Sequence, residues 1–321
     1  MQKSRAILLL NLGSPDAPTV PAVRKYLREF LGDRHVISLP WIFRKILLEC
    51  FILPRRPKKS AALYKRIWTS SGSPLIRETE KLRERLAEKL CGRAKVFCAM
   101  RYGNPGVKNV LQKIKSEGIS EVFIIPLYPQ CAESSWITAA EHAKKIFEKN
   151  APEISIRFAK PYYAEPEFIK ALAEVSRRFI AEKHFDKLLI SFHGVPVKTS
   201  LAQSYKKECE TTGTLLAKAL NLSENCWEVA FQSHFGKGKW LEPSTESRLE
   251  NLPQENVKNL AVIAPGFSAD CLETLDELAI RGKEKFLKSG GNAFFTIPCL
   301  NDSESFVKFL SELFIRNFPD I

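Results

Sequence analysis

Eight short apolar segments, rich in β-branched and aromatic residues, recur along the chain, and most are separated by stretches of helical periodicity. Nearly continuous apolar strands that alternate with helices are typical of parallel sheets covered on both faces. The eight segments span residues 6–12, 94–100, 121–127, 154–159, 187–192, 226–232, 259–264 and 292–297. They predict an α/β protein, and the 321 residues suffice for two domains of about 150 residues each.

Two pairs of similar segments indicate that the two domains share one architecture. ILLLNLGSP at 7–15 resembles KLLISFHGVP at 187–196, and VFIIPLYPQCAESS at 122–135 resembles LAVIAPGFSADCLET at 260–274. We therefore expect two Rossmann-like domains, each with a parallel β-sheet flanked by helices. Their predicted bounds are 1–155, completed by a C-terminal helix at 303–321, and 156–302.

The first domain is longer than the second, and we place an insertion in it at residues 35–73. Residues 34–66 hold nine Lys or Arg but only one acid, Glu49, and account for most of the net charge of +13. Within them, WIFRKILLECFILP at 41–54 is mostly large and apolar. This pattern predicts either an exposed apolar lip with cationic edges or a helical hairpin packed on the core. Nucleic acid is not an expected partner, because the charge forms one local block without a nucleic-acid-binding motif.

Several classes of protein are excluded by motifs that the sequence lacks. The eight cysteines include no CxxC pair, and no GxGxxG, GxxxxGK[ST] or HExxH occurs. Zinc knuckles, dinucleotide-binding folds, P-loop enzymes and zincins would therefore lack the residues that hold their metal or phosphate. The first apolar run ends at Asn11, too short for a signal peptide or a membrane span, so we expect a cytoplasmic protein.

His193 is the first candidate for chemistry, because it follows an apolar strand and ligands of open α/β sheets bind beyond the carboxyl ends of strands. Gly194 comes next and lets the chain turn. An imidazole in this place can accept a proton near neutral pH or bind a borderline metal ion. The alternative is a histidine that is hydrogen-bonded to nearby backbone. The local sequence does not separate these roles.

Acidic residues begin a predicted helix after another strand. Asp270 and Glu273 have the spacing of a helix capping box, which would make both of them structural. Glu277 lies four residues further on the same face, and the helix begins at a strand end in the same cleft as His193. A histidine that faces two carboxylates offers nitrogen and oxygen ligands suited to ferrous iron or zinc. A site for protons and a divalent cation is therefore the alternative to the capping box.

Six motifs, which follow one another along almost the whole chain, resemble those of ferrochelatases. They are LNLGSP (10–15), MRYGNP (100–105), PLYPQ (126–130), SFHGVP (191–196), FQSHFGKGKWLEPST (231–245) and ADCLETLDEL (269–278). Ferrochelatases insert ferrous iron into a porphyrin in the terminal step of haem biosynthesis. The resemblance implies two Rossmann-like domains with a porphyrin cleft between them, and an apolar lip that closes over the porphyrin and can touch a membrane.

The resemblance also assigns roles to individual residues. His193 and Glu273 match the catalytic pair that binds the metal and takes up the pyrrole protons, and Asp270 and Glu277 match a path for protons or metal. The expected porphyrin-binding residues are Leu12, Tyr102, Tyr128, Trp240, Arg55 and Arg56, with the two arginines as partners of the porphyrin propionates.

The sequence departs from the family pattern at several positions. Arg281 stands where the line of carboxylates would continue, which argues against a third acidic step. Cys131 follows YPQ where the family usually has tyrosine, and the GDPY segment common after the histidine is missing. No cysteine cluster lies near Ile321, so we expect no iron–sulfur cluster and no other permanently bound cofactor.

We therefore expect a ferrochelatase, a lyase that inserts ferrous iron into protoporphyrin IX with release of two protons. The resemblance favours protoporphyrin over coproporphyrin III, because relatives that use coproporphyrin tend to carry a tyrosine just before the first glycine, and this chain has Leu12 there. The expected partners are the porphyrin, Fe(II) and, transiently, the inner face of a membrane through residues 41–59, with the protein a monomer or homodimer. The alternatives are a chelatase for coproporphyrin III or another tetrapyrrole or metal, and a carrier that binds haem or porphyrin without chemistry.

Overall fold

The computed structural model describes residues 4–234 and 238–318, and the contacts within it divide the chain into two units. Unit 1 comprises the chain up to Leu127, then Glu133–Lys160 and the described residues from Leu310 onward. Unit 2 comprises Tyr128–Ala132 and Pro161–Phe309. Each unit contains one four-stranded parallel sheet flanked by helices, which confirms the predicted fold class.

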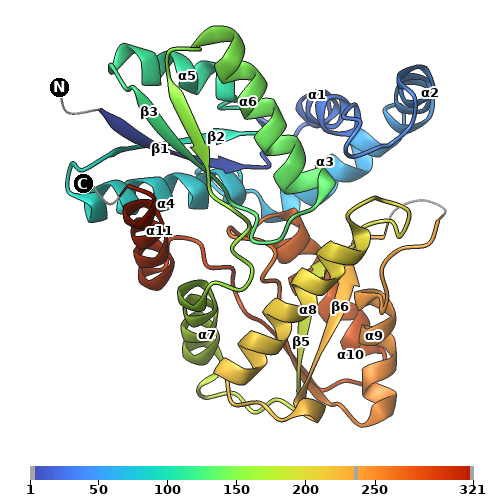
Figure 1. Ribbon diagram of the computed structural model, residues 1–321. Coiled ribbons are helices and arrows are strands. Elements are labelled where there is room, and N and C mark those ends of the chain that lie inside the picture. The colour runs from blue at the N-terminus through green and yellow to red at the C-terminus, as the bar shows by residue number, and fades with distance from the viewer. Residues whose placement is uncertain (1–3, 235–237, 319–321) are drawn as a thin grey trace. The chain divides into compact units, whose positions relative to one another are not determined.

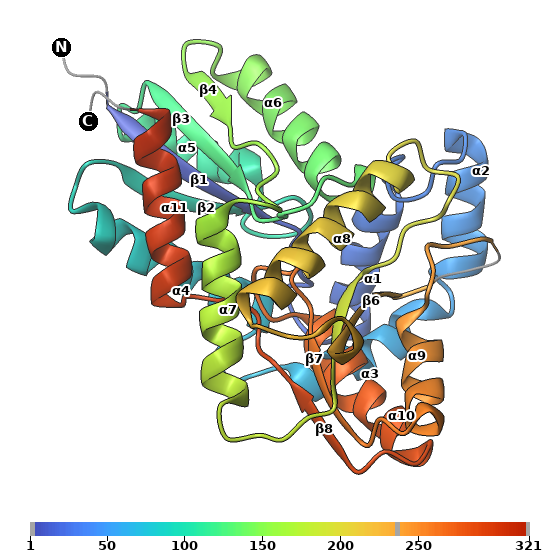
Figure 2. The same cartoon turned by 60° about the horizontal axis from the view of Figure 1, so that its bottom comes forward.

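The sheet of unit 1 has the strand order β2-β1-β3-β4. Its strands are β1 (Arg5–Asn11), β2 (Lys95–Met100), β3 (Glu121–Pro126) and β4 (Ser155–Phe158), all parallel. Residues 6–10 of the central strand β1 are fully buried, as expected of an apolar strand covered by helices on both faces. α4 (Pro74–Leu90) lies on one side of this sheet, and α5 (Val107–Ser116) and α6 (Thr138–Asn150) lie on the other (Figure 1). The edge strand β4 runs beside α6 (Figure 2).

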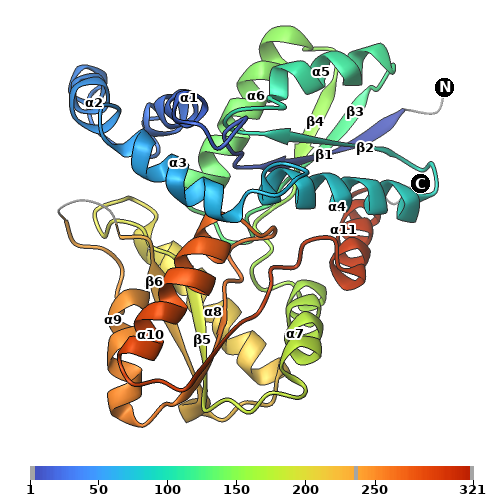
Figure 3. The same ribbon diagram turned by 180° about the vertical axis from the view of Figure 1, so that it is seen from behind.

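The sheet of unit 2 has the order β6-β5-β7-β8, which repeats the order of unit 1 when strands are counted along each unit. Its strands are β5 (Lys187–His193), β6 (Trp227–Gln232), β7 (Asn259–Ile263) and β8 (Ala293–Thr296). Helices cover both faces, since α8 (Ala202–Ala219) lies in front of the sheet in Figure 1 and α10 (Lys283–Lys288) in front of it in Figure 3. The remaining elements of this unit are α7 (Pro166–Ile180), η3 (Glu224–Cys226), α9 (Thr245–Asn251), η4 (Leu252–Glu255) and the π-helix η5 (Glu273–Gly282). The last helix, α11 (Glu304–Asn317), begins in unit 2 and ends in unit 1.

Both sheets have a topological switch point beside the first strand of the unit. The chain adds its second strand on one side of the first and its third strand on the other, so the connections leave in opposite directions and open a crevice at the carboxyl ends. In unit 2 this point lies between β5 and β7. The residues that follow these two strands are therefore the ones that the fold presents to a ligand.

The predicted insertion forms three helices in unit 1 after α1 (Val20–Leu31). They are α2 (Trp41–Ile46), the π-helix η1 (Leu47–Ile52) and α3 (Arg56–Ile67). Six apolar residues around α2 and η1 are 42–64% exposed, and we call them the lip: Leu39, Trp41, Ile42, Phe43, Ile46 and Phe51. By contrast, α3 buries Ala61, Tyr64 and Ile67. The packed-hairpin alternative is therefore wrong for α2, although it describes α3. None of the helices within the described residues is both long and apolar enough to cross a membrane.

Candidate active site

His193 is the last residue of β5 and lies at the switch point of unit 2. Its backbone carbonyl accepts a hydrogen bond of 2.8 Å from the Tyr205 hydroxyl, and its ring lies edge-on to Phe267, with 6.2 Å between the ring centroids. The next residue, Gly194, has no room for a side chain, because a Cβ there would lie 2.8 Å from the Gln232 carbonyl oxygen and 3.1 Å from the His234 ring. Close approach of two neighbouring strand ends thus requires this glycine and fixes the place of His193.

The surroundings of His193 favour its neutral form. Burial lowers the pKa of His193, the negative charge of Glu273 acts in the opposite direction, and His234 adds to the lowering. The net result is a pKa below the usual value for histidine. A neutral imidazole has the free nitrogen lone pair that both a metal ligand and a proton acceptor need. Glu273 begins the helix that follows β7, the strand next to β5, and its negative charge acts on this imidazole.

Glu273 begins η5, a π-helix of ten residues that continues into α10. Helices of this kind are rare and occur frequently at functional sites. Gln232 at the end of β6 holds the start of η5, because its amide donates a 3.1 Å hydrogen bond to the Glu273 carbonyl oxygen. The Gln232 amide oxygen accepts in turn from Ser191 of β5 at 2.8 Å. Buried hydrogen bonds therefore connect the strand that carries His193 to the helix that carries Glu273.

Asp270 has structural contacts that differ from the predicted capping box. Its carboxylate accepts from the Thr274 hydroxyl at 3.1 Å, from the Asn301 side-chain amide at 2.8 Å and from the Cys299 backbone N–H at 3.3 Å. The residue before η5 has no side-chain capping bond, and the helix that follows is a π-helix rather than an α-helix. The capping-box interpretation is therefore wrong. Asp270 instead joins the start of η5 to the loop after β8.

Glu277 lies one turn along η5 from Glu273, and two hydrogen bonds from one residue hold it. The Ser233 backbone N–H donates to one carboxylate oxygen at 2.8 Å, and the Ser233 hydroxyl donates to the other at 2.6 Å. Burial raises the pKa of Glu277, and the bonds from Ser233 together with the charge of Arg281 partly offset this effect.

A small cavity of about 150 Å³ adjoins Glu277 within unit 2. Most of its polar lining comes from the loop after β6, from α9 and from the far end of η5 into α10. The polar and charged residues of the lining are Gln232, Ser233, His234, Ser244, Thr245, Glu246, Glu277, Arg281 and Lys285. A polar space of this size has room for several water molecules.

Trp240, a predicted porphyrin-binding residue, is half-buried and stacks on the ring of His234, with 5.5 Å between the centroids and 21° between the planes. His234 is exposed and packs next to the Gly194 backbone. The unit therefore presents two imidazoles and two aromatic rings, Phe267 and Trp240, around one group of strand ends. Residues 235–237 of the corresponding sequence motif lie outside the described residues.

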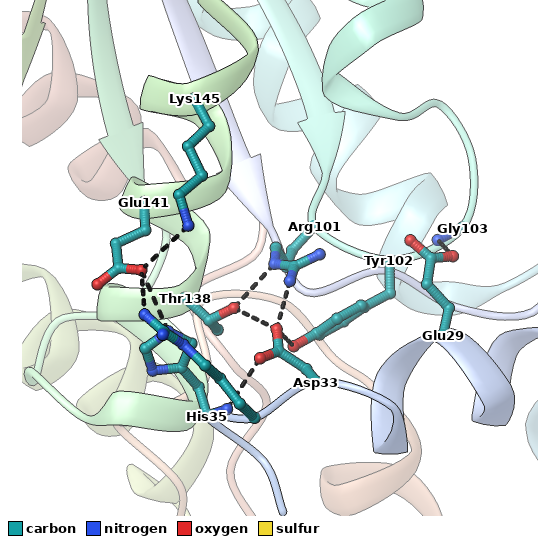
Figure 4. A network of polar contacts seen from close by, with 10 residues as sticks. Glu29, Asp33, His35, Arg101, Tyr102, Gly103, Thr138, Glu141 and Lys145 are labelled. Atoms are coloured by element: carbon teal, nitrogen blue, oxygen red, sulfur yellow. Dashed lines mark hydrogen bonds and ion pairs between the residues drawn. The ribbon is translucent and has the colours of Figure 1, made fainter. Parts of the chain in front are cut away.

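Tyr102, another predicted porphyrin-binding residue, belongs to unit 1 and is fully buried. Its hydroxyl donates a 2.8 Å hydrogen bond to the Asp33 carboxylate, which also accepts from Thr138 at 2.6 Å, from the His35 backbone N–H at 2.8 Å and from Arg101 (Figure 4). Burial raises the pKa of the Tyr102 phenol, so it stays protonated and keeps donating. In this structure the hydroxyl serves the Asp33 network, and a porphyrin contact of Tyr102 stays a prediction.

The other predicted porphyrin-binding residues lie in different parts of the units. Leu12 follows β1 and is half-buried, while Tyr128 follows β3 in sequence, belongs to unit 2 and is buried. Arg55 is exposed just before α3, and the half-buried Arg56 is the first residue of that helix. Their roles stay predictions. Within unit 2, the structure brings His193, Glu273, Glu277 and Trp240 to one group of strand ends, with Asp270 beside them.

Several residues of the site were not singled out from the sequence. Gln232, Ser233 and His234 lie together at and just after the end of β6, the strand next to β5. The strand-end rule that points to His193 also places this segment beyond the strands, but it assigns none of these three residues a role. The hydrogen bonds between Ser233 and Glu277 depend on a left-handed backbone at Ser233, which has φ of 64°, and this has no sequence signal in a non-glycine residue.

The described residues contain no cluster of three or more His, Cys, Asp or Glu side chains arranged to hold a metal ion. His193 and Glu273 are two potential ligands with different donor atoms. A site with few protein ligands leaves coordination positions open for a reacting molecule, whereas structural metal sites are closed by four protein ligands.

The comparisons with known proteins concern the chain as a whole. The ferrochelatase family model matches residues 4–318. The chain is 43% identical over 319 residues to a ferrochelatase of Neisseria gonorrhoeae, covering 98% of this chain and 94% of that protein. It is 38% identical over 333 residues to a ferrochelatase of Pseudomonas putida, covering 96% and 98%.

Among solved structures, the sirohydrochlorin chelatase SirB from Bacillus subtilis subspecies spizizenii in complex with cobalt is similar in fold. The TM-score is 0.57 at 12% identity, covering 99% of this chain and 97% of that one. CbiX, described as the terminal enzyme for siroheme biosynthesis in denitrifying bacteria, has a TM-score of 0.53 at 16% identity, covering 97% and 99%. These two likenesses concern the fold alone. The match of the family model over nearly the whole length and the identity to curated relatives show that the chain belongs to the ferrochelatase family.

Proposed function

We propose that this protein inserts ferrous iron into protoporphyrin IX to form protohaem, with release of two protons, as a lyase of haem biosynthesis. The observation that carries the proposal is the pairing of His193 with Glu273 at the switch point of unit 2, in a chain of the ferrochelatase family. This is the place where an open α/β sheet binds its ligand.

The chemistry requires that two N–H protons leave the porphyrin while one Fe(II) enters, so that the charges balance. His193 is neutral near pH 7 because its pKa is lowered, and its free nitrogen can accept a pyrrole proton. The carboxylate of Glu273 stabilises the imidazolium that results. A base placed in this way contributes roughly 10² to 10⁴ to the rate in typical enzymes.

Binding energy also has to bend the flat macrocycle, since its nitrogen lone pairs become accessible to the metal only when the ring leaves planarity. Phe267 and Trp240 offer apolar aromatic surface beside His193 and Gly194. Aromatic faces stack on flat conjugated ligands and can hold them in a strained shape. The strain is offset by the binding energy of contacts with the rest of the ligand. We assign these two rings to the porphyrin.

The preference for protoporphyrin over coproporphyrin rests on Leu12, which follows β1 and precedes Gly13. Protoporphyrin has vinyl groups where coproporphyrin has two further propionates, and a leucine offers an apolar contact without a polar partner for a carboxylate. Leu12 is therefore consistent with the more apolar substrate.

The lip supports transient contact with a membrane surface. Its large side chains are exposed, including Trp41 and Phe43 at 64% each, and basic residues such as Arg44 and Lys45 lie among them. Apolar side chains with cationic neighbours bind the interface of an anionic bilayer. Such contact would place the protein where an apolar porphyrin is dissolved.

The experiment that tests the function is anaerobic incubation of the purified protein with Fe(II), or Zn(II) as an air-stable substitute, and either protoporphyrin IX or coproporphyrin III. We expect multiple turnovers with protoporphyrin IX, followed by the change in the Soret and visible absorption bands. Faster insertion into coproporphyrin III would overturn the substrate assignment. Tight porphyrin binding without turnover would overturn the enzymatic function and favour a carrier.

A further inference from the structure

The loops that follow β5 and β6 pair with each other beyond the ends of these strands. The Val197 N–H donates to the Lys239 carbonyl oxygen at 2.9 Å. The Leu241 N–H donates to the Val195 carbonyl oxygen at 3.1 Å. Trp240 lies between the two bonded positions of its loop, so this short antiparallel ribbon fixes the backbone of Trp240 within unit 2.

The side chain of Trp240 has one ring partner among the described residues, His234. The two rings are nearly parallel, with 21° between their planes and 5.5 Å between their centroids, which is the geometry of an offset stack. The orientation of a tryptophan side chain depends on two torsion angles, so a ring that is stacked on its face restricts it strongly. Trp240 is half-buried, and part of its surface therefore stays accessible.

His234 is itself held in place, although it is exposed. A Cβ at Gly194 would lie 3.1 Å from its ring, so the imidazole packs against the backbone of that glycine. Ser233 precedes it with φ of 64°, and the Ser233 N–H and hydroxyl donate to the Glu277 carboxylate at 2.8 and 2.6 Å. The turn that presents His234 is thus anchored to η5.

The stack contributes little to the fold of the unit, because His234 is exposed and substitutions of exposed side chains usually change the unfolding free energy only slightly. What the stack fixes is the plane of an indole, in the loop next to the one that begins after His193. A binding surface that is ordered before its ligand arrives loses less side-chain entropy on binding, and it therefore binds more tightly.

We propose that His234 is a positioning residue for the porphyrin, and that its imidazole holds the indole of Trp240 in the orientation in which this indole stacks on the macrocycle. This inference rests on the proposed function, which assigns Trp240 to the porphyrin. The role requires a flat ring at residue 234, and it requires neither the ring nitrogens nor a positive charge.

The test compares porphyrin binding with metal insertion in the full-length protein. Protoporphyrin IX without metal is the probe, and the change in its Soret band gives Kd, while steady-state insertion of Zn(II) gives KM and kcat. His234→Ala should raise Kd and KM by about 2- to 12-fold, the range that corresponds to the free energy of one aromatic pair, and should leave kcat unchanged. His234→Phe keeps a flat ring without nitrogen or charge, so its Kd and KM should return close to the wild-type values.

A double-variant cycle tests whether His234 acts through Trp240. Trp240→Ala should raise Kd, and His234→Ala should have no further effect in that background, because the ring that it positions is already absent. His184→Ala is the matched control. It removes an exposed histidine that precedes β5 and pairs with Asp186, and its Kd, KM and kcat should equal those of the wild type.

Three results would overturn the assignment of His234. The first is an unchanged Kd in His234→Ala, and the second is an additive effect of His234→Ala and Trp240→Ala. The third is a fall in kcat that His234→Phe shares with His234→Ala, which would assign the imidazole to the metal, to a proton, or to the lowering of the pKa of His193 to which its charge contributes.

The proposed function fails separately from this inference. A wild-type protein that binds protoporphyrin IX but inserts no metal would overturn the enzymatic function, while the comparison of Kd values among the variants would still decide the role of His234.

Discussion

The two units have the same strand order but use their strand ends differently. In unit 1, Leu12 and Gly13 follow the first strand, whereas in unit 2 the equivalent positions are His193 and Gly194. In both units a π-helix lies between the third strand and the next α-helix, η2 (Glu133–Ile137) in unit 1 and η5 in unit 2. Only the longer one, η5, carries acids of the proposed site. One architecture thus carries the proposed catalytic pair in one copy and a long helical insertion in the other.

The charged groups differ in the same way. In unit 1, Asp33 accepts four hydrogen bonds and its side chain is 6% exposed, so this carboxylate is satisfied within the fold (Figure 4). In unit 2, Glu277 accepts two hydrogen bonds from Ser233 and lines a small polar cavity. A buried carboxylate with all its partners inside one unit stabilises that unit, whereas one that borders water can exchange protons.

The largest effect on activity should follow substitution of His193, which stands where unit 1 has Leu12. We expect His193→Ala to lower the rate of metal insertion by roughly 10² to 10⁴, because it removes the proposed proton acceptor and ligand. Porphyrin binding, followed by quenching of tryptophan fluorescence, should remain. His184→Ala is the control, since its side chain is 83% exposed in the same unit and it should retain full activity. Retained turnover in His193→Ala would contradict the assignment.

Asp33→Ala should have the next largest effect, on stability rather than chemistry. It leaves Arg101, Tyr102 and Thr138 without their common acceptor, and breaking a buried pair of this kind costs about 3–5 kcal/mol of unfolding free energy. Urea denaturation at pH 7 measures this loss of unfolding free energy. Asp16→Ala removes an exposed ion pair with Lys25 in the same unit and should cost about 0–1 kcal/mol.

The difference in unfolding free energy between the wild type and Asp33→Ala should depend on pH, which provides a second check on Asp33. Burial acts to raise the pKa of Asp33, but the hydrogen bonds from Thr138, His35 and Tyr102 and the charge of Arg101 outweigh it, so the pKa lies below the usual value. The stabilisation is then fully present above the unfolded pKa of about 3.9 and is lost as the pH falls through the folded one. The wild type and Asp33→Ala should therefore converge in stability in strong acid, and a gap that is independent of pH would contradict this explanation.

Gly13 and Gly194, which follow the first strand of each unit, allow an effect on stability to be separated from an effect on activity. We expect their substitution by alanine to have effects of intermediate size. A Cβ at Gly13 would lie 1.8 Å from the Tyr102 carbonyl oxygen at φ of +107°, so Gly13→Ala should cost about 2–5 kcal/mol in denaturation. Gly194→Ala would place its Cβ 2.8 Å from the Gln232 backbone carbonyl oxygen, a less severe overlap than at Gly13, and should cost about 1–3 kcal/mol, but it should also lower activity roughly 10- to 100-fold by displacing His193. If both variants lost the same activity for each kcal/mol of unfolding free energy lost, Gly194 would have no role in activity beyond stability, and the proposed difference between the two units would be wrong.

The smallest effect on stability is expected at the lip. Trp41→Ser combined with Phe43→Ser should change the unfolding free energy by no more than about 0.5 kcal/mol, because both side chains are already 64% exposed. The same variant should bind anionic vesicles at least about tenfold more weakly in a sedimentation assay. Val197→Ser, at an exposed apolar position of unit 2, should leave vesicle binding unchanged. Undiminished binding by the lip variant would place any membrane contact elsewhere.

Much of the fold could be predicted because apolar strands and their order along the chain are local signals. The eight predicted strand segments correspond to the eight strands found among the described residues, and the strand-end rule led to His193. The switch point explains why Glu273 lies near it, although 80 positions separate the two in sequence. Residues that follow neighbouring parallel strands meet at one edge of a sheet, whatever their separation along the chain.

Other features had no local signal. The spacing of Asp270 and Glu273 is that of a capping box, but tertiary contacts with Asn301 and Cys299 decide the role of Asp270. The π-helical path of η5 and the left-handed turn at Ser233 are conformations that ordinary propensities disfavour, so only the surrounding structure selects them. The exposure of Trp41 and the burial of Tyr64 could likewise not be separated, because both lie in one amphipathic insertion.

The most direct measurement is anomalous diffraction from crystals soaked with a substrate metal such as Zn(II) or Co(II), collected above and below the absorption edge of that metal. The proposed roles predict a peak about 2.0–2.2 Å from a ring nitrogen of His193 and from a carboxylate oxygen of Glu273, with further coordination positions open. The peak should vanish in His193→Ala. A metal bound elsewhere in the wild type, with none between His193 and Glu273, would contradict the assignment of this pair as the site of metal insertion.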